Sequence, residues 1–172
     1  MLLTDGINMA GHTFTTGEYV VYPAHGVGKL TGRELHEISG HQLELLVINF
    51  DKERMTLRLP VAKAQAAGLR ALCSQEDMQK ALETLTVRTK QKRTMWSRRA
   101  QEYENKINSG NPCSIAEVIR ELYRNQSDTD QSYSERQIYQ AAIERLGREL
   151  AAVERIDENS AVSKMESILK AA

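Results

Sequence analysis

Two hydrophobic periods divide the chain near residue 72. Before that point, apolar and polar residues alternate in short runs bounded by glycine, proline and aspartate, which is typical of β-strands joined by turns. These runs predict four strands, over residues 18–22, 27–38, 42–50 and 55–60. Four short strands in so short a stretch predict a small β-barrel.

The fourth predicted strand has a clear alternation. Met55, Leu57 and Leu59 alternate with Thr56 and Arg58, and successive side chains of a strand point to opposite faces. The first three are therefore expected to be buried, and Arg58 is expected on the other, exposed face. The alanine-rich residues 61–67 then predict one or two helical turns that Gly68 ends.

After residue 73 the hydrophobic period becomes helical. One helix is the most strongly marked, because Ile115, Val118, Ile119, Leu122 and Tyr123 share one face. The sequence predicts helices over residues 74–85, 94–108, 134–156 and 160–169, and one more that starts at Ser114. Three of them begin with a pair of capping residues: Ser74 with Asp77, Ser114 with Glu117, and Ser134 with Gln137.

The chain is therefore expected to be an α+β protein of two domains. We expect a flexible extension over residues 1–13, a barrel over residues 14–72, an all-α domain over residues 73–157, and a helix or tail over residues 158–172. This division is more typical of an adaptor with two binding sites than of an enzyme with one pocket.

The charge distribution is uneven although the total is balanced. Lys and Arg number 23, as do Asp and Glu, so the formal net charge is zero and nothing global indicates a nucleic-acid or membrane partner. The net charge is nevertheless −2 up to residue 85, +5 over residues 86–106 and −3 beyond. One basic block lies between two mildly acidic flanks.

The basic block is the candidate site of this sequence. Residues 88–99, R-T-K-Q-K-R-T-M-W-S-R-R, contain six basic residues, no acid and the single Trp of the chain. A helix that begins near residue 94 would offer free N–H groups beside Arg98 and Arg99, which suits a phosphate. Two simpler readings stay open: a solvated basic face, and a Trp96 that enters the core with Ala100, Tyr103 and Ile107 on one stripe.

Several classes of protein are disfavoured. No apolar run is long enough for a membrane span, and the first residues lack the pattern of a secretory signal, so a cytoplasmic protein without a membrane partner is expected. Cys73 and Cys113 are far apart, and the histidines have no metal-ligand spacing. Nucleophile, carboxylate-pair and cofactor motifs are also missing, so we expect no metal, no cofactor and no enzyme.

Seven motifs resemble the CarD family of bacterial transcription regulators. The first, V-V-Y-P-A-H-G-V-G at residues 20–28, is similar to an element that CarD shares with transcription-repair coupling factor. The others follow in family order: M-T-L-R-L-P at 55–60, G-L-R at 68–70, W-S-R-R at 96–99, N-K-I-N-S-G at 105–110, A-E-V-I-R-E-L at 116–122 and S-E-R at 134–136. The resemblance covers about residues 14–154.

The resemblance implies a fold and a function for each domain. Its first module is a Tudor-like, or SH3-like, barrel that binds the β subunit of bacterial RNA polymerase. Its helical domain contacts promoter DNA at the upstream edge of the melted region without reading sequence, and a tryptophan wedge in the minor groove lengthens the life of the open complex. A monomer without cofactor is expected.

The resemblance also assigns residues. Trp96 is the wedge, and Arg98 and Arg99 are the phosphate contacts beside it. The more distant basic residues would attract DNA only in general: Arg88, Lys90, Lys92 and Arg93. The expected polymerase surface is Arg58 with His36 and with Met55, Thr56 and Leu57 of the same strand as Arg58. His36 departs from the family pattern, because relatives often carry a full positive charge there.

Two other functions remain as alternatives. The chain could be a protein–protein adaptor that binds RNA polymerase without touching DNA, which the neutral net charge favours. It could also be an enzyme, although no catalytic motif supports that interpretation. Titration of Trp96 fluorescence with forked DNA would distinguish the adaptor from the DNA-contacting regulator.

Overall fold

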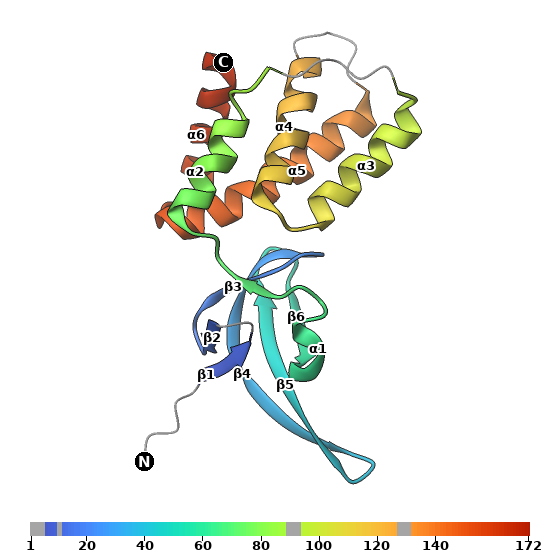
Figure 1. Cartoon of the computed structure of the whole chain (residues 1–172), viewed down its shortest axis with the longest axis vertical. Helices are drawn as coiled ribbons and strands as arrows, with labels where there is room; N and C mark the ends of the chain where they lie inside the picture. Colours follow the sequence, from blue (N-terminus) through green and yellow to red (C-terminus); the bar gives the residue numbers. More distant parts are fainter. Residues whose placement is uncertain (1–5, 10–11, 89–93, 127–131) are drawn as a thin grey trace. The chain divides into compact units, whose positions relative to one another are not determined.

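The structure is a computed structural model that describes residues 6–9, 12–88, 94–126 and 132–172. It divides into two compact units, Met1–Leu72 and Cys73–Ala172. This division coincides with the change of hydrophobic period near residue 72. The first unit is built around an antiparallel sheet and the second from helices, so the chain is an α+β protein with the sheet before the helices (Figure 1).

A five-stranded antiparallel sheet forms the first unit, in the order β6-β5-β4-β3-β7. Four of its strands match the predicted ones within one residue at each end. The strands are β3 (Tyr19–Tyr22), β4 (Gly26–Ile38), β5 (His41–Phe50), β6 (Met55–Pro60) and β7 (Arg70–Ala71). The short helix α1 (Val61–Ala64) follows β6, and the backbone then turns at Gly68, whose φ is 82°.

The predicted barrel is not confirmed, because the sheet does not close. Closure requires the two edge strands to pair with each other. In the described part of the chain, β6 pairs with β5 and the two residues of β7 pair with β3. The short alternating runs predicted the strands correctly but contain no information about whether the edges meet.

β4 and β5 continue beyond the rest of the sheet as a two-stranded hairpin. β6 pairs with β5 only over residues 45–50, and β3 pairs with β4 only over residues 26–29. The outer part, residues 35–44, is flanked by none of the described strands and is called the hairpin arm (Figure 1). Its turn uses Ser39 and Gly40, with φ of 53° and 79°, the two positive values of a type I′ turn.

The core of the sheet unit requires a glycine in β4. A Cβ at Gly28 would lie 2.7 Å from Ile48 Cγ2 and 2.8 Å from Phe50 Cε1. Both neighbours are almost completely buried in the core cluster of this unit. The β4 backbone can approach these side chains so closely only because residue 28 has none of its own.

The described residues of the predicted extension over residues 1–13, which are residues 6–9 and 12–13, lie in β-strands. β1 (Gly6–Met9) pairs in antiparallel fashion with β2 (His12–Thr15). Phe14 of β2 is 2% exposed and belongs to the core of the sheet unit. The sequence analysis predicted no strand before residue 18, so this pair was missed.

The described residues of the second unit form five helices. They pack around one apolar cluster that includes Leu82, Tyr103, Ile119 and Leu146. The helices are α2 (Gln75–Thr84), α3 (Trp96–Asn108), α4 (Pro112–Gln126), α5 (Tyr133–Glu154) and α6 (Glu158–Ala171). The apolar face predicted for α4 is confirmed, with Ile115, Val118, Ile119 and Leu122 all buried.

Two predicted helix starts are wrong. Helix α4 begins at Pro112, not at Ser114, because the Asn111 side chain accepts the N–H groups of Cys113 and Ser114 and proline suits the first helical position. Helix α5 is capped by Ser132, whose hydroxyl accepts the N–H of Glu135, and not by Ser134.

Helix α6 begins slightly earlier than predicted. The Asp157 side chain accepts the Ser160 N–H and caps the helix. Hydrogen bonding from the Ser160 side chain, followed by that from its N–H, lowers the pKa of the Asp157 carboxyl. The predicted Ser74 cap of α2 is confirmed.

Candidate functional sites

The N-terminal end of α3 is the first candidate site. Met95 precedes the helix with φ −55° and ψ 138°, makes no capping side-chain hydrogen bond and is 72% exposed. The first turn contains no acid and carries Arg98 and Arg99. The Arg98 and Arg99 N–H groups donate to the Met95 carbonyl. The Trp96 and Ser97 N–H groups, which have no partner among the described residues, therefore lie together with the positive end of the helix dipole and two cations.

Among the described residues, neither a first-turn acid nor a capping side chain compensates the positive charge at this end of α3. The first turns of α2, α5 and α6 each contain an acid and a capping side chain, and α4 has the Asn111 cap. Within the described helices of this unit, α3 alone has neither. Such an arrangement costs helix stability and favours an anion from outside the protein.

Trp96, the first residue of α3, is partly buried and packs against the helical core. Its ring centroid lies 6.3 Å from that of Tyr103, with the planes at 53°. The stripe predicted from the sequence is present, since Tyr103 and Ile107 are buried. Trp96 is neither fully inside the core nor free of it, so one edge is held while part of the indole stays accessible.

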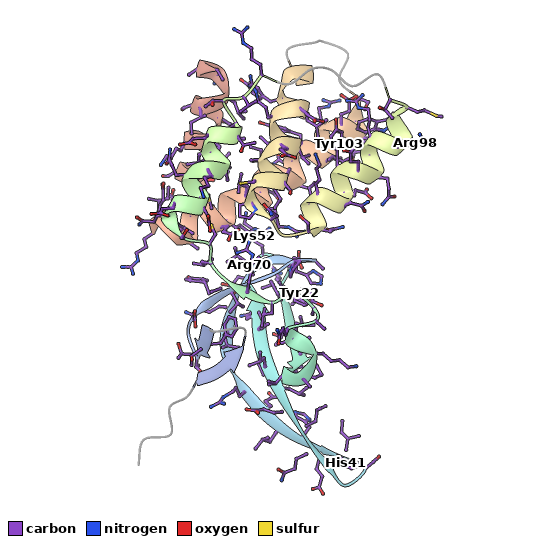
Figure 2. All side chains as sticks on the ribbon, in the orientation of Figure 1. Tyr22, His41, Lys52, Arg70, Arg98 and Tyr103 are labelled. Carbon is purple, nitrogen blue, oxygen red and sulfur yellow. The ribbon has the colours of Figure 1, made fainter. Side chains whose placement is uncertain are left out.

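Arg98 and Arg99 have different environments. Arg98 is exposed and lies at the N-terminal end of α3 (Figure 2). The Arg99 guanidinium lies 5.5 Å from the centroid of Trp96 and 5.8 Å from that of Tyr103, and it donates a hydrogen bond of 3.3 Å to the Tyr103 hydroxyl. Arg99 is therefore engaged within the protein, unlike Arg98.

The basic block is only partly described. Arg88 is exposed, whereas Lys90, Lys92 and Arg93 lie outside the described residues. Arg120, a buried residue of α4, donates its Nε–H to the Val87 carbonyl at 2.6 Å. The chain is thus fixed to the helical core just before the block, and Trp96 contacts that core just after it.

The second candidate site is the exposed edge of the sheet unit. β6 is an edge strand that pairs only with β5 in the described sheet. Thr56 and Arg58 are exposed, while Met55 and Leu57 are partly buried against the core. The predicted alternation is confirmed, but Met55 and Leu57 are core-facing and only their neighbours offer side chains to solvent.

His36 and Arg58 meet at one carboxylate. Glu34 Oε2 lies 2.8 Å from His36 Nε2 and 3.0 Å from Arg58 Nε. The His36 hydrogen bond, followed by that of Arg58, holds the pKa of Glu34 below its ordinary value. Residues far apart in the sequence therefore form one polar cluster across β4 and β6, although the cluster is exposed and screened by solvent.

The hairpin arm adds apolar surface that the sequence did not indicate. Leu35 is 71% and Ile38 is 58% exposed, and they lie on either side of His36 in β4. Alternation alone cannot distinguish a strand covered by a core from one that extends beyond it. Isolated hairpins are marginally stable in water, so these side chains gain most if a partner covers them.

Two other kinds of function find no site in the described parts of the chain. No group of three or more His, Cys, Asp or Glu residues among them could hold a metal ion. None of the described helices is both long and apolar enough to cross a membrane.

Comparison with known proteins accounts for both units. Residues 14–73 match the family model "CarD-like/TRCF RID domain", and residues 80–166 match "CarD, C-terminal domain". A Bacillus subtilis (strain 168) protein named "Putative transcription factor YdeB" is 26% identical over 145 residues, which cover 84% of this chain and 95% of that protein.

Proposed function

The chain belongs to the CarD family, whose first domain interacts with RNA polymerase, and on that premise we propose a specific mechanism of transcription regulation. The sheet unit docks on the polymerase β subunit through the β6 edge and the Glu34 cluster. The helical unit contacts promoter DNA at the upstream edge of the bubble. Trp96 acts there as a wedge and prolongs the life of the open complex.

The observation that carries the proposal is the uncapped, acid-free start of α3. The Arg98 N–H donates to the Met95 carbonyl, but the Trp96 and Ser97 N–H groups have no partner among the described residues, and with the exposed Arg98 side chain they suit a phosphate. Trp96 stands directly beside them and keeps part of its indole accessible. Apolar wedges of architectural proteins work in this way, with neighbouring cations on the phosphates.

The wedge acts on an equilibrium. Unstacking a base step costs a few kcal/mol, and an indole that fills the gap lowers that cost in the open state only. A bias of about 1.4 kcal/mol changes the ratio of open to closed complex tenfold. One aromatic side chain with adjacent phosphate contacts is sufficient for an effect of this size.

Polymerase supplies the specificity. Phosphate contacts carry no base code, and the minor groove distinguishes few base pairs. With a formal net charge of zero, the chain has little general attraction to DNA. Docking on polymerase raises the local concentration of the helical unit at the promoter, as in other tethered binders.

The docking surface of the proposal combines three features. The free edge of β6 can pair with a strand of the partner, Arg58 is exposed beside it, and the hairpin arm presents the exposed Ile38 on the same strand face as His36. Glu34 bonds both His36 and Arg58, which orients them before the partner arrives. Apolar anchors with oriented charged neighbours are common at protein interfaces.

The adaptor without DNA contact remains a second candidate. It is favoured by the packing of Trp96 against the helical core, which gives the indole a structural role without DNA. Titration of Trp96 fluorescence with forked DNA discriminates between the two. The adaptor predicts no change, whereas the proposed regulator predicts a saturable change.

The direct test is the lifetime of the open complex on a purified promoter after challenge with a competitor. Trp96→Ala should shorten the lifetime by up to about tenfold, while the variant still co-purifies with polymerase. Because Trp96 also packs on the core, Trp96→Phe and a thermal melt serve as controls for folding. An unchanged lifetime with a correctly folded Trp96→Ala protein excludes the wedge.

A further inference from the structure

Arg99 is built into an aromatic cluster at the start of α3. Its guanidinium lies 5.5 Å from the Trp96 centroid and 5.8 Å from the Tyr103 centroid. Its Nη2 donates to the Tyr103 hydroxyl at 3.3 Å. One cation therefore spans two rings on the same face of one helix.

The environment of Arg99 disfavours a direct role on phosphate. Its Nε is covered from solvent and has no hydrogen-bond partner in the described structure. A guanidinium that contacts phosphate normally presents its donors outward in a fork. Here one donor is covered and another is used by Tyr103.

Tyr103 connects the cluster to the next helix. It is 2% exposed in the core beneath Trp96, and the Glu121 carboxylate of α4 acts on its hydroxyl together with Arg99. The partly buried Trp96 indole contacts Arg99, Arg99 contacts Tyr103, and Tyr103 is buried in the core of the helical unit. Arg99 is the member that contacts both rings.

We propose that Arg99 is a positioning residue, which holds the Trp96 indole in the orientation used at the DNA and does not itself bind phosphate. This inference rests on the proposed function, since it concerns the same wedge. Cation–π contact fixes the plane of the indole from one side while Tyr103 supports its edge. The wedge is then oriented before DNA arrives, which lowers the entropy cost of insertion.

The neighbour Arg98 provides a matched control. It carries the same chemistry one residue away, is exposed, and lies in the same helical turn. If phosphate binding is the task, Arg98 performs it without contact to the aromatic cluster. Removal of each arginine should therefore affect different observables.

The first measurement uses the free full-length protein. The chain has a single Trp, so selective excitation reports Trp96 alone, and acrylamide quenching measures its accessibility. Arg99→Met and Arg99→Lys should both increase quenching, because neither replacement has a planar cation that covers the ring. Arg98→Met should leave quenching as in the wild type.

The second measurement is affinity for forked DNA as a function of salt. Arg98→Met should reduce the slope of log affinity against log salt by about one, as the loss of one phosphate contact does. Arg99→Met should weaken binding about three- to tenfold, the effect of one lost cation–π contact, with the slope unchanged.

Arg99→Lys decides between the two roles, and a melting curve first establishes that it folds. A phosphate contact would survive this replacement, with wild-type quenching and wild-type affinity, and that result would overturn the proposal. Increased quenching with reduced affinity and an unchanged slope supports it. Trp96→Ala separates failure of the proposed function from failure of the positioning role. If Trp96→Ala leaves the affinity for forked DNA unchanged, the proposed function is wrong. If Arg99→Lys is quenched as in the wild type, the positioning role is wrong.

Discussion

The missing cap of α3 gives the sharpest test of the idea that this helix end is kept open for DNA. Met95 has the backbone of a capping residue, with φ −55° and ψ 138°. The capping residues Ser74, Ser132 and Asp157 have similar values, with φ from −66° to −74° and ψ from 157° to 163°. Met95 is also 72% exposed, so Met95→Asn should be accommodated with little loss of packing.

The expected gain in stability follows from the Ser97 N–H, which has no partner among the described residues, whereas the Arg98 N–H already donates to the Met95 carbonyl. A capping side chain contributes about 1 kcal/mol relative to a residue that cannot cap. Met95→Asp adds a negative charge beside Arg98, Arg99 and the helix dipole, for a further 0.3–1 kcal/mol, roughly. For a unit of about 100 residues, each kcal/mol raises the melting temperature by about 4–8 °C.

The same substitutions should affect DNA binding in the opposite direction. An added carboxylate competes with phosphate for the N–H groups and repels it, so Met95→Asp should weaken binding to forked DNA more than Met95→Asn does. Met95→Leu, which neither caps nor adds charge, is the control. Thermal melting by circular dichroism and a forked-DNA titration give the two readings for each variant.

The reasoning would be refuted by either of two results. One is a Met95→Asn protein that melts at the temperature of Met95→Leu, since the N–H groups would then already be satisfied. The other is a Met95→Asp protein that is stabilised but binds forked DNA as tightly as the wild type, since an anion would then have no site at this helix end.

Three further predictions concern docking, packing and pH. Arg58→Glu should weaken binding to an isolated β-subunit fragment by about tenfold or more, because it reverses the charge. Lys29→Glu, on an exposed part of β4, is the control. Equal affinities of the Arg58→Glu and Lys29→Glu proteins in a pull-down titration would show that Arg58 is not in the interface. Gly28→Ala should lower the free energy of unfolding in urea by about 1–3 kcal/mol, because the added Cβ meets buried side chains. Gly32→Ala, with nothing within 4 Å of its Cβ, should leave this free energy almost unchanged. Similar decreases for both variants would contradict the close approach at Gly28. Burial raises the pKa of Tyr103 from 10.0 to about 12, so the unfolded chain loses the hydroxyl proton at lower pH than the folded chain does. The stability that the protonated Tyr103 contributes below pH 10 is therefore lost as the pH rises toward 12. Tyr103→Phe should show a flatter alkaline decline in melting temperature, and a decline as steep as that of the wild type would exclude Tyr103 as the cause.

The strands and the best-marked helix could be predicted because their signals are local. Met55, Leu57 and Leu59 alternate with polar neighbours, and the structure places Arg58 on the exposed face accordingly. Likewise Ile115, Val118 and Ile119 share one helix face and are buried. The pattern of buried positions along a strand or helix depends only on residues a few positions apart, so a single sequence is sufficient to predict it.

Features set by distant contacts could not be predicted. The exposure of Leu35 and Ile38 depends on where β3 and β6 end, and not on the residues of β4 themselves. The start of α4 was missed for a local reason: the Ser114 and Glu117 pattern competes with Asn111, which caps the helix ahead of Pro112, and proline suits the first helical position.

The candidate DNA site was predicted in part. The sequence located the basic block and Trp96, and the charge pattern was the signal. It gave Arg98 and Arg99 the same role, because adjacent arginines look alike in a sequence. Their difference depends on Tyr103, one turn further along α3, and on the aromatic contacts that only coordinates contain.

The central claim is that polymerase delivers a wedge that acts on the open complex, and one titration tests it most directly. Open-complex lifetime is measured against protein concentration for the wild type, Arg58→Glu and Trp96→Ala. We expect Arg58→Glu to reach the wild-type lifetime only at a concentration about tenfold higher, and Trp96→Ala to saturate at the wild-type concentration with a shorter lifetime. A folded Trp96→Ala protein that reaches the full wild-type lifetime would contradict the account.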